Sequence, residues 1–467
     1  MKNLLVLLVM IAVSNPSQSQ HSTKQAIELT RAMANELLKT SNMPGISVAI
    51  SQKGKIVFAE GFGFADVANN IPVTTTTEFR TASVAKIITA TALGKLVQEG
   101  KLNLDLPIQE YVPGFPVKEF PITARQLAGH LSGLPHYSEG NKIENRVYSS
   151  VQDALGVFSH ESLLSKPETK DRYSTHGFTL LSAVIEGASG TNYLDYMENQ
   201  VFKPLKMNAT EPDRRTQKPN TKAAKLYTVE NGVQKEVKTP KEVSYKWAGG
   251  GLLTTPTDLI QLANGYFNGF LRPDMVKMMF ESQNLTSSEK TQVGIGWRTS
   301  QDIEGRRVIE HAGSMQGARS VICIYPDEQL VISMMVNAEW PSTIEETAHL
   351  LARPFLSPKR PKSVPVGDFT ISTTSINGRG KETLAKATLK LNGKNGAIFF
   401  EDGQQLPIIY LHENTVFALI RPDSIFYLTM EFTEKTVTGK AIAYGSQQSK
   451  CPISNPPFFT FTSSNEK

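Results

Sequence analysis

The chain has 467 residues, 40% of them hydrophobic and 20% charged, which is ordinary for a globular protein of about two to three domains and excludes a largely disordered one. Its net charge of +5 is spread along the sequence and is not gathered in Lys/Arg runs, so nothing indicates a nucleic-acid partner. Beyond the N-terminus no stretch of about 18 apolar residues occurs, so we expect no membrane span.

The N-terminus has the pattern of a secretory signal peptide. Lys2 is followed by an apolar stretch, Leu4 to Val13, and then by the small and polar residues 14–17. The apolar stretch is too short to cross a bilayer. We therefore predict a signal peptide over residues 1–20, cleaved near Gln20, and a periplasmic or secreted protein. The alternative is a buried N-terminal strand.

Hydrophobic periodicity predicts the helices and strands in chain order. A helix is expected over 24–40, a β-hairpin over 45–65 with its turn at Lys53 and Gly54, and a long helix from Ser83 to a stop at Gly100. Further helices are expected over 150–164 and 176–190, a hairpin over 225–237, and two strands over 306–313 and 318–338. Strands at both ends with helices between them indicate an α+β sheet, not a doubly wound parallel one.

The C-terminal part of the chain has a different composition. Residues 353–366 are rich in proline and lysine and are interpreted as a linker, because such a stretch neither continues a helix nor enters a central strand. After it, short alternating strands with Gly, Asn and Asp turns predict a separate all-β domain over 367–467. Residues 21–352 then form the main domain.

The chain contains two cysteines, Cys323 and Cys451. They are too few for a disulfide framework or a set of metal ligands, and no other metal or phosphate-binding motif occurs. We expect no metal and no cofactor. A bridge between the two cysteines stays an open alternative to a buried thiol at Cys323.

Ser83 and Lys86 lie three residues apart at the start of the helix that is expected to end at Gly100. A serine hydroxyl becomes a good nucleophile when a base removes its proton, and a lysine with a lowered pKa can be that base. Residues three apart on a helix have Cβ atoms about 5–6 Å apart, so the side chains can meet. The alternative is a helix cap followed by a surface lysine, since Ser287 and Lys290 show the same spacing in a polar stretch.

Two further motifs follow in the sequence. Tyr173-Ser174-Thr175 precedes the helix expected over 176–190, where a tyrosine hydroxyl near cations could carry a proton. His311-Ala312-Gly313-Ser314 ends a predicted strand, where small residues would let backbone N–H groups approach an oxyanion. Taken singly, the first motif also fits a tyrosine packed at a helix entrance, and the second an ordinary tight turn.

The three motifs in this order resemble those of the serine β-lactamase and penicillin-binding protein superfamily, in the branch of class C β-lactamases, D-aminopeptidases and related esterases. Residues 79–90, 122–137, 173–197 and 245–259 are especially similar to the mitochondrial serine β-lactamase-like proteins and their bacterial relatives. The resemblance covers roughly residues 25–340. It implies a β-lactamase/transpeptidase-like fold, with an antiparallel sheet flanked by helices and a helical lobe.

The resemblance also implies roles for the matching residues. Ser83 would be the acylated nucleophile, Lys86 its base, and Tyr173 the acid that protonates the leaving group. The backbone N–H groups of Ser83 and Ser314 would form the oxyanion hole. Thr175, His311, Gly313 and Trp247 would contact the substrate, with Trp247 in the wall of the cleft.

Two residues depart from the family pattern. Thr175 stands where the second motif commonly ends in asparagine, and His311 stands where β-lactamases carry lysine in the third motif. Histidine is largely neutral at pH 7, so it offers no permanent cation to a substrate carboxylate. Arg319 could supply a compensating cation. Efficient hydrolysis of β-lactam antibiotics is therefore not the expected main activity. The remaining histidines are interpreted as structural or surface residues: His130, His136, His160, His176, His349 and His412.

The predicted function is an exported serine hydrolase that cleaves amide or ester bonds through an acyl-enzyme on Ser83, most simply a peptidase of the penicillin-binding type. Its substrates would be small peptides, D-amino-acid amides or esters, with peptidoglycan as a further partner. Two alternatives stay open: a carboxylesterase that uses the same residues, and a weakly active scaffold that binds peptidoglycan or self-assembles.

Overall fold

The computed structural model describes residues 16–137, 143–231, 233–302, 306–341 and 344–356, together with the strands between residues 367 and 464. Residues 1–15 of the predicted signal peptide, residues 357–366 of the predicted linker and Cys451 lie outside the described residues. Cys323 is a buried free thiol. None of the described helices is both long and apolar enough to cross a membrane.

A seven-stranded antiparallel sheet forms the centre of the main domain, with the strand order β3-β2-β1-β12-β11-β10-β9. The strands are β1 (Gly45–Gln52), β2 (Lys55–Asp66), β3 (Ile71–Pro72), β9 (Arg298–Gln301), β10 (Arg307–Met315), β11 (Ala318–Tyr325) and β12 (Leu330–Val336). The predicted α+β class is confirmed, since the N-terminal hairpin pairs with the late strands through Ile46 and Val336.

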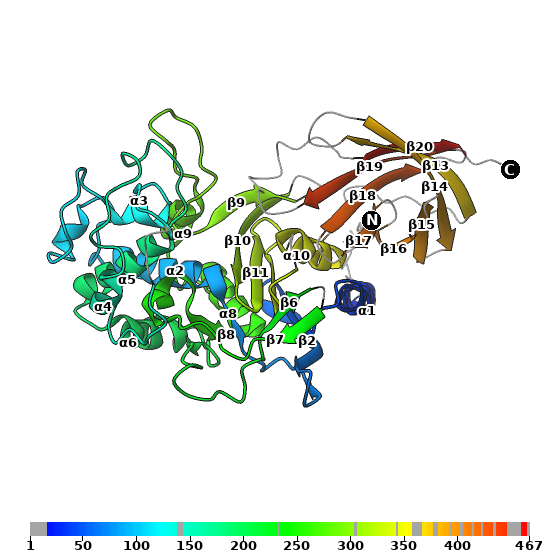
Figure 1. Ribbon diagram of the computed structural model, residues 1–467. Helices are drawn as coiled ribbons and strands as arrows, with labels where there is room; N and C mark the ends of the chain where they lie inside the picture. Colours follow the sequence, from blue (N-terminus) through cyan, green and yellow to red (C-terminus); the bar gives the residue numbers. More distant parts are fainter. Residues whose placement is uncertain are drawn as a thin grey trace, which may run out of the picture.

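Both faces of the sheet are covered, and alternate residues of a strand enter different cores. On β1, Ala49 belongs to one apolar cluster, while Val48 and Ile50 belong to another. The second cluster lies under α1 (Pro16–Thr40) and α10 (Ile344–Ala352). The first cluster is larger and joins the sheet to α8 (Pro256–Phe267) and the helical lobe (Figure 1).

The helical lobe is built around α2 (Ala85–Gln98), which is buried over most of its surface, and α5 (Thr175–Ser189). Gly190, with φ of 66°, ends α5 as the sequence predicts. The helix expected over 150–164 is wrong in length, because α4 spans only Val151–Leu155 and the chain turns from Gly156 onward. The other helices of the lobe are α3 (Ala124–Ala128), α6 (Tyr193–Met197), α7 (Trp247–Gly250) and α9 (Pro273–Phe280).

Several short elements complete the main domain. They are η1 (Ala82–Val84), η2 (Ile108–Glu110), η3 (Glu198–Phe202), η4 (Ser244–Lys246), η5 (Arg353–Phe355), and the strands β4 (Phe79–Arg80), β5 (Glu211–Pro212) and β8 (Leu252–Thr254), which form a small sheet. The predicted hairpin is present as β6 (Tyr227–Glu230) and β7 (Val233–Glu236).

The C-terminal strands close into a barrel. They are β13 (Gly367–Ile376), β14 (Glu382–Asn392), β15 (Asn395–Phe400), β16 (Gln405–His412), β17 (Thr415–Arg421), β18 (Ser424–Phe432), β19 (Thr436–Gly445) and β20 (Phe459–Ser464). All neighbouring strands are antiparallel, and β20 pairs with β13 to complete the ring. All described elements of the C-terminal part are thus strands, as expected. Figure 1 shows this barrel at one end of the molecule, beside α1.

A buried ion pair fixes the small sheet next to η1. Arg80 donates from Nε to Asp213 at 2.7 Å, and both side chains are only 1% exposed. Burial raises the pKa of Asp213, but Arg215 and Arg80 more than offset this and hold it below its ordinary value. Asp213 is therefore ionised and compensates the charge of Arg80.

Replacement of Asp213 with alanine is expected to destabilise the protein by about 3–5 kcal/mol, because the buried guanidinium of Arg80 loses its counter-ion. Urea unfolding followed by circular dichroism measures this loss. The matched control is Glu230→Ala, which removes an exposed carboxylate 2.7 Å from Lys235 and should cost less than about 1 kcal/mol. Equal losses in the two variants would contradict the prediction.

Candidate active site

Ser83 lies in η1, the short turn that leads from β4 into α2. The residue before it, Ala82, has φ of 44°, a left-handed conformation that costs a residue with a Cβ about 1–2 kcal/mol. Val84 is the N-cap of α2, and no side chain caps this helix. The hydroxyl of Ser83 is therefore free from a capping role, and the helix-cap alternative is wrong.

Lys86 is fully buried beside Ser83. Its Nζ donates to Ser83 Oγ at 3.3 Å, to Thr175 Oγ1 at 3.1 Å and to the carbonyl oxygen of Gly249 at 2.6 Å. Lys86 is thus not a surface lysine. Burial lowers its pKa from 10.5, although the nearby Tyr173 partly opposes this, so the neutral amine is more accessible than in a free lysine.

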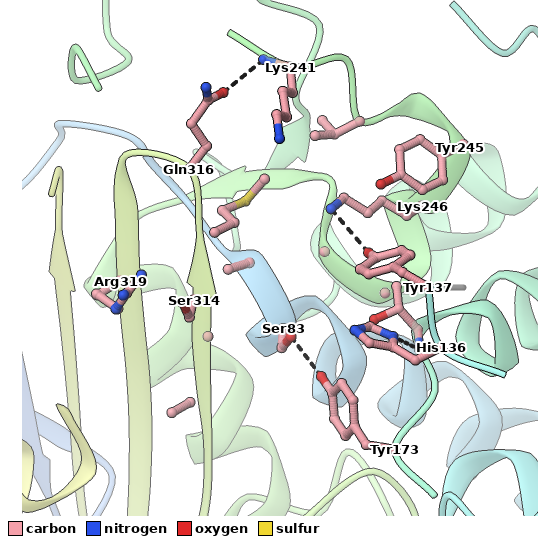
Figure 2. Close-up of a pocket in the computed structure, with 18 of the residues that line it drawn as sticks. Ser83, His136, Tyr137, Tyr173, Lys241, Tyr245, Lys246, Ser314, Gln316 and Arg319 are labelled. Atoms are coloured by element: carbon pink, nitrogen blue, oxygen red, sulfur yellow. Dashed lines mark hydrogen bonds between the residues drawn. The ribbon is translucent and has the colours of Figure 1, made fainter. Parts of the chain in front are cut away.

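Tyr173 completes the cluster from the entrance of α5. Its hydroxyl donates to Ser83 Oγ at 2.7 Å (Figure 2), and Lys86 Nζ lies 4.8 Å from the centre of its ring. Burial raises the pKa of Tyr173, but the charge of Lys86 and the hydrogen bonds with Lys86 and Ser83 together outweigh burial and lower this pKa below 10. Two groups able to exchange a proton therefore contact one serine oxygen.

Strand β10 faces this cluster with a free edge. Its pairing with β9 ends at Glu310, so β9 does not cover the stretch from His311 to Met315. A Cβ on Gly313 would lie 2.8 Å from the backbone nitrogen of Ser83. A side chain cannot fit between two backbones this close, which explains the glycine. The N–H of Ser83 and the edge of β10 thus flank the same space, as an oxyanion hole requires.

The side chains of the second and third motifs have different surroundings. Thr175 lines the pocket and accepts a hydrogen bond from Lys86. His311 is 1% exposed and is not part of the pocket wall. Its Nδ1 lies 2.7 Å from the carbonyl oxygen of Ala312, and burial, with Arg298 and Lys86, holds its pKa well below 6.5. His311 is a neutral, buried residue and not a contact for substrate.

Trp247 also differs from its predicted role. It borders a small internal cavity with Val151 and Tyr193, and it is not among the residues that line the large pocket. The preceding residue, Lys246, lines that pocket instead. Because successive residues of a helical turn point about 100° apart, the start of α7 directs these two side chains to different spaces.

The pocket in front of Ser83 has a volume of about 910 Å³. It lies between β10 and the helical lobe, and its walls include Ser83, Tyr173, Gly313 and Ser314. A pocket of this size can hold a small peptide or a drug-sized ester. Arg319 lies at the β11 side of the pocket, beside Ser314 (Figure 2).

His136 is a pocket residue that the sequence interpretation assigned to the structural or surface group. Its Nδ1 accepts a hydrogen bond from the backbone N–H of Thr175 at 3.1 Å, so its Nε2 carries the proton. Burial, together with Lys86 and Lys246, lowers its pKa to about 4. The sequence feature that could have identified His136 as a pocket residue is its position next to Tyr137, in the family-like segment 122–137. His130, by contrast, is buried and accepts from Ser174 N, in agreement with its scaffold role.

The second Ser-x-x-Lys pair has none of these contacts. Both residues are exposed and neither is in a helix: Ser287 lies in a turn, and Lys290 forms an isolated β-bridge with Asn284. They are therefore a useful control for Ser83 and Lys86.

One buried cluster brings together residue types that can bind metals. His349 Nε2 lies 2.7 Å from Glu310 Oε2, and Cys323 Sγ donates to the same oxygen at 3.3 Å. Burial lowers the pKa of His349, but Glu310 outweighs this and raises it above 6.5. The three residues satisfy one another as an ion pair with a thiol donor. The sequence did not indicate this cluster, because its members are far apart in the chain.

Contact of a lysine and a tyrosine with one serine, at a pocket between an antiparallel sheet and a helical lobe, is an arrangement typical of serine hydrolases. The chain belongs to the beta-lactamase family, because the family model described as "Beta-lactamase" matches its residues 30–353. The predicted superfamily is therefore confirmed, and so is the assignment as a serine hydrolase.

Two curated relatives show how the chain fits in this family. It is 30% identical over 400 residues to the human serine beta-lactamase-like protein LACTB, mitochondrial, an alignment that covers 65% of this chain and 73% of that protein. It is 26% identical over 337 residues to penicillin-binding protein 4* of Bacillus subtilis, covering 68% and 74%.

Solved structures support the fold. The octameric penicillin-binding protein homologue from Pyrococcus abyssi superposes with a TM-score of 0.60 at 20% identity, covering 93% of this chain and 99% of that one. The D-amino acid amidase from Ochrobactrum anthropi SV3 gives a TM-score of 0.57 at 22% identity, covering 67% and 91%. At these identities the likeness shows the β-lactamase/transpeptidase-like fold.

Proposed function

We propose that the protein cleaves amide or ester bonds through an acyl-enzyme on Ser83. The observation that carries the proposal is the convergence of Lys86 and Tyr173 on Ser83 Oγ at a pocket of substrate size. Lys86 takes the serine proton, and Oγ attacks the substrate carbonyl. The negative charge that forms on the carbonyl oxygen is stabilised by the N–H groups of Ser83 and Ser314.

Collapse of the tetrahedral intermediate breaks the bond to the leaving group. Tyr173, 2.7 Å from Ser83 Oγ, donates a proton to the departing nitrogen or oxygen. Water then attacks the ester on Ser83, with the same groups acting in the reverse direction, and releases the acid. Thr175 holds Lys86 in place through the 3.1 Å hydrogen bond.

We infer that the substrates are small peptides or D-amino-acid amides. The names of penicillin-binding protein 4* and of the D-amino acid amidase support this class. The neutral, buried His311 leaves the third motif without the cation that a β-lactam carboxylate would meet, which supports an activity other than β-lactam hydrolysis. Peptidoglycan fragments belong to the same chemical class.

We also propose that the protein is exported, on the basis of Lys2, the apolar stretch Leu4 to Val13 and the small residues that follow. The LACTB relatives carry the word mitochondrial in their names, which leaves a targeting sequence for an organelle as the competing interpretation of the same segment.

Labelling of Ser83 tests the proposed function. A fluorophosphonate should form an adduct with the wild-type protein that mass spectrometry locates on Ser83, and Ser83→Ala should abolish it. Ser287→Ala is the matched control and should label like the wild type, because Ser287 is exposed and has no buried base. An adduct that persists in Ser83→Ala would refute the assignment, and absence of any adduct would favour the scaffold alternative.

Comparison of substrates then separates the two enzymatic alternatives. Hydrolysis of D-amino-acid amides or short peptides supports the peptidase, whereas turnover of p-nitrophenyl esters alone supports the carboxylesterase.

A further inference from the structure

In the described wall of the pocket in front of Ser83, the carboxylates all have partners, whereas some of the cations have no carboxylate partner and can bind a ligand. This wall holds three carboxylates, each with a partner of its own. Glu144 lies 2.9 Å from Arg146, and Glu345 lies 3.5 Å from Arg298. Glu242 accepts hydrogen bonds from Thr216 and from the backbone N–H groups of residues 243 and 244.

Of the four lysine and arginine side chains in this wall, only Arg298 forms an ion pair with a carboxylate of the described residues. Lys246 donates from Nζ to the hydroxyl of Tyr137 at 3.2 Å and lies 5.4 Å from the centre of that ring. Within the part of the chain that the structure describes, no carboxylate lies within ion-pair distance of Lys246 or of Lys241. A neutral phenol compensates an ammonium group far less than an anion does.

The lack of a carboxylate partner destabilises the charged form of Lys246, because of where this side chain lies. The side chain is partly buried, and burial lowers its pKa from 10.5. Tyr137 opposes this shift in part, whereas Lys86 and Arg80 add repulsion. A negative charge within about 4–6 Å would restore the charged form. Among the described residues, the surroundings of Lys246 thus contain no anion to pair with it.

The neighbouring Lys241 is held by its backbone so that its side chain enters the same space. Its N–H donates to the side chain of Gln316 at 2.9 Å, and its carbonyl oxygen accepts from Arg80 at 3.0 Å. Figure 2 shows the Lys241 side chain directed into the pocket on the same side of Ser83 as Lys246.

Arg319 is less available to a ligand than Lys246 and Lys241. Its guanidinium donates to the carbonyl oxygens of Pro341 at 2.9 Å and of Ala318 at 3.2 Å. The arginine that the sequence offered as a substitute for the third-motif lysine is thus bound to backbone carbonyls.

Lys246 and Tyr173 approach Ser83 from different sides. In Figure 2 Tyr173 contacts Ser83 from below, whereas Lys246 and Tyr137 lie above it. Under the proposed mechanism, on which this inference rests, Tyr173 protonates the leaving group. The leaving group therefore occupies the side of Tyr173, and the acyl part of the substrate faces Lys246.

We propose that Lys246, assisted by Lys241, binds a carboxylate on the acyl part of the substrate, so that the enzyme prefers acyl groups with an acidic side chain or terminus. This subsite selects the acid that becomes attached to Ser83, not the group that leaves. The ammonium of Lys246 keeps its hydrogen bond to Tyr137 and donates a second one to the carboxylate.

Two matched esters test the inference. The p-nitrophenyl monoester of adipic acid and p-nitrophenyl hexanoate differ only in a terminal carboxylate in place of a methyl group. The wild type should have a higher kcat/KM for the adipate, and Lys246→Gln should lower the adipate-to-hexanoate ratio of kcat/KM about tenfold. Lys246→Arg, which keeps the charge, should retain most of the preference. Lys235→Gln, in the exposed hairpin, should behave like the wild type.

The outcomes separate this inference from the proposed function. If the fluorophosphonate labels Ser83 but the wild type shows no preference for adipate, or releases p-nitrophenolate from neither ester, the carboxylate subsite is refuted while the nucleophile stands. A preference that survives Lys246→Gln also refutes it. If Ser83 is not labelled, the proposed function itself fails.

Discussion

Replacement of Lys86 with methionine is expected to lower kcat/KM for an activated ester by about 10²–10⁴-fold while the fold is kept, because methionine fills the buried space without providing a base. The wild-type rate should increase as the pH rises through the pKa of Lys86, since only the neutral amine accepts the proton of Ser83. Burial lowers this pKa, so the increase should occur below the range of a free lysine. Stopped-flow measurement of acylation over a pH series gives both quantities.

The control for Lys86 is Lys290→Met, which removes the exposed lysine of the second Ser-x-x-Lys pair and should change neither the rate nor its pH dependence. A Lys86→Met variant that keeps the wild-type pH profile would show that Lys86 is not the base. In that case Tyr173, whose pKa is also lowered, would be the remaining candidate in contact with Ser83 Oγ.

The second large effect is expected at Gly313. Valine there would push its Cβ toward the backbone nitrogen of Ser83, 2.8 Å away, and the carbonyl oxygen of Thr81, 2.6 Å away. Since these atoms are backbone, they cannot move aside cheaply, and the space for the oxyanion closes. We expect Gly313→Val to lower kcat by about 10²–10³-fold, the range for loss of an oxyanion-hole donor.

Ser314→Ala is the matched control for Gly313→Val. It removes an exposed hydroxyl but keeps the backbone N–H that would contact the oxyanion, so kcat should stay within about threefold of the wild type. Steady-state kinetics on one ester suffice for both variants. A large loss in Ser314→Ala with little change in Gly313→Val would contradict the backbone oxyanion hole.

The parts of the site that could be predicted are those encoded by local spacing. Ser83 and Lys86 are three residues apart on one helix, so their contact follows from helical geometry, and the order of the motifs identified Tyr173. The α+β class followed from alternating strands at both ends of the main domain. The pairing of β1 with β12 was indicated only in outline, because strand order depends on non-local packing.

Other residues were assigned incorrectly because their environment depends on the direction of a side chain in the folded protein. Nothing in the sequence distinguishes Lys246 from Trp247 as the pocket residue, since the two are adjacent and only the directions of their side chains differ, by about 100°. His311 was expected to contact substrate, but its side chain is 1% exposed and does not line the pocket. His136 was grouped with scattered histidines, although its hydrogen bond to Thr175 N brings it to the pocket.

The pairing of β1 with β12 has a consequence for synthesis of the protein. Ile46 leaves the ribosome early but must wait for Val336 before its strand has a partner on that side. Ser83, in η1, is packed against β10, which also comes late in the chain. Such distant pairings fold slowly. A nascent or truncated chain that ends before β10 therefore carries Ser83 and Lys86 without the strand against which η1 packs. We expect hydrolase activity only after nearly all of the main domain has been translated.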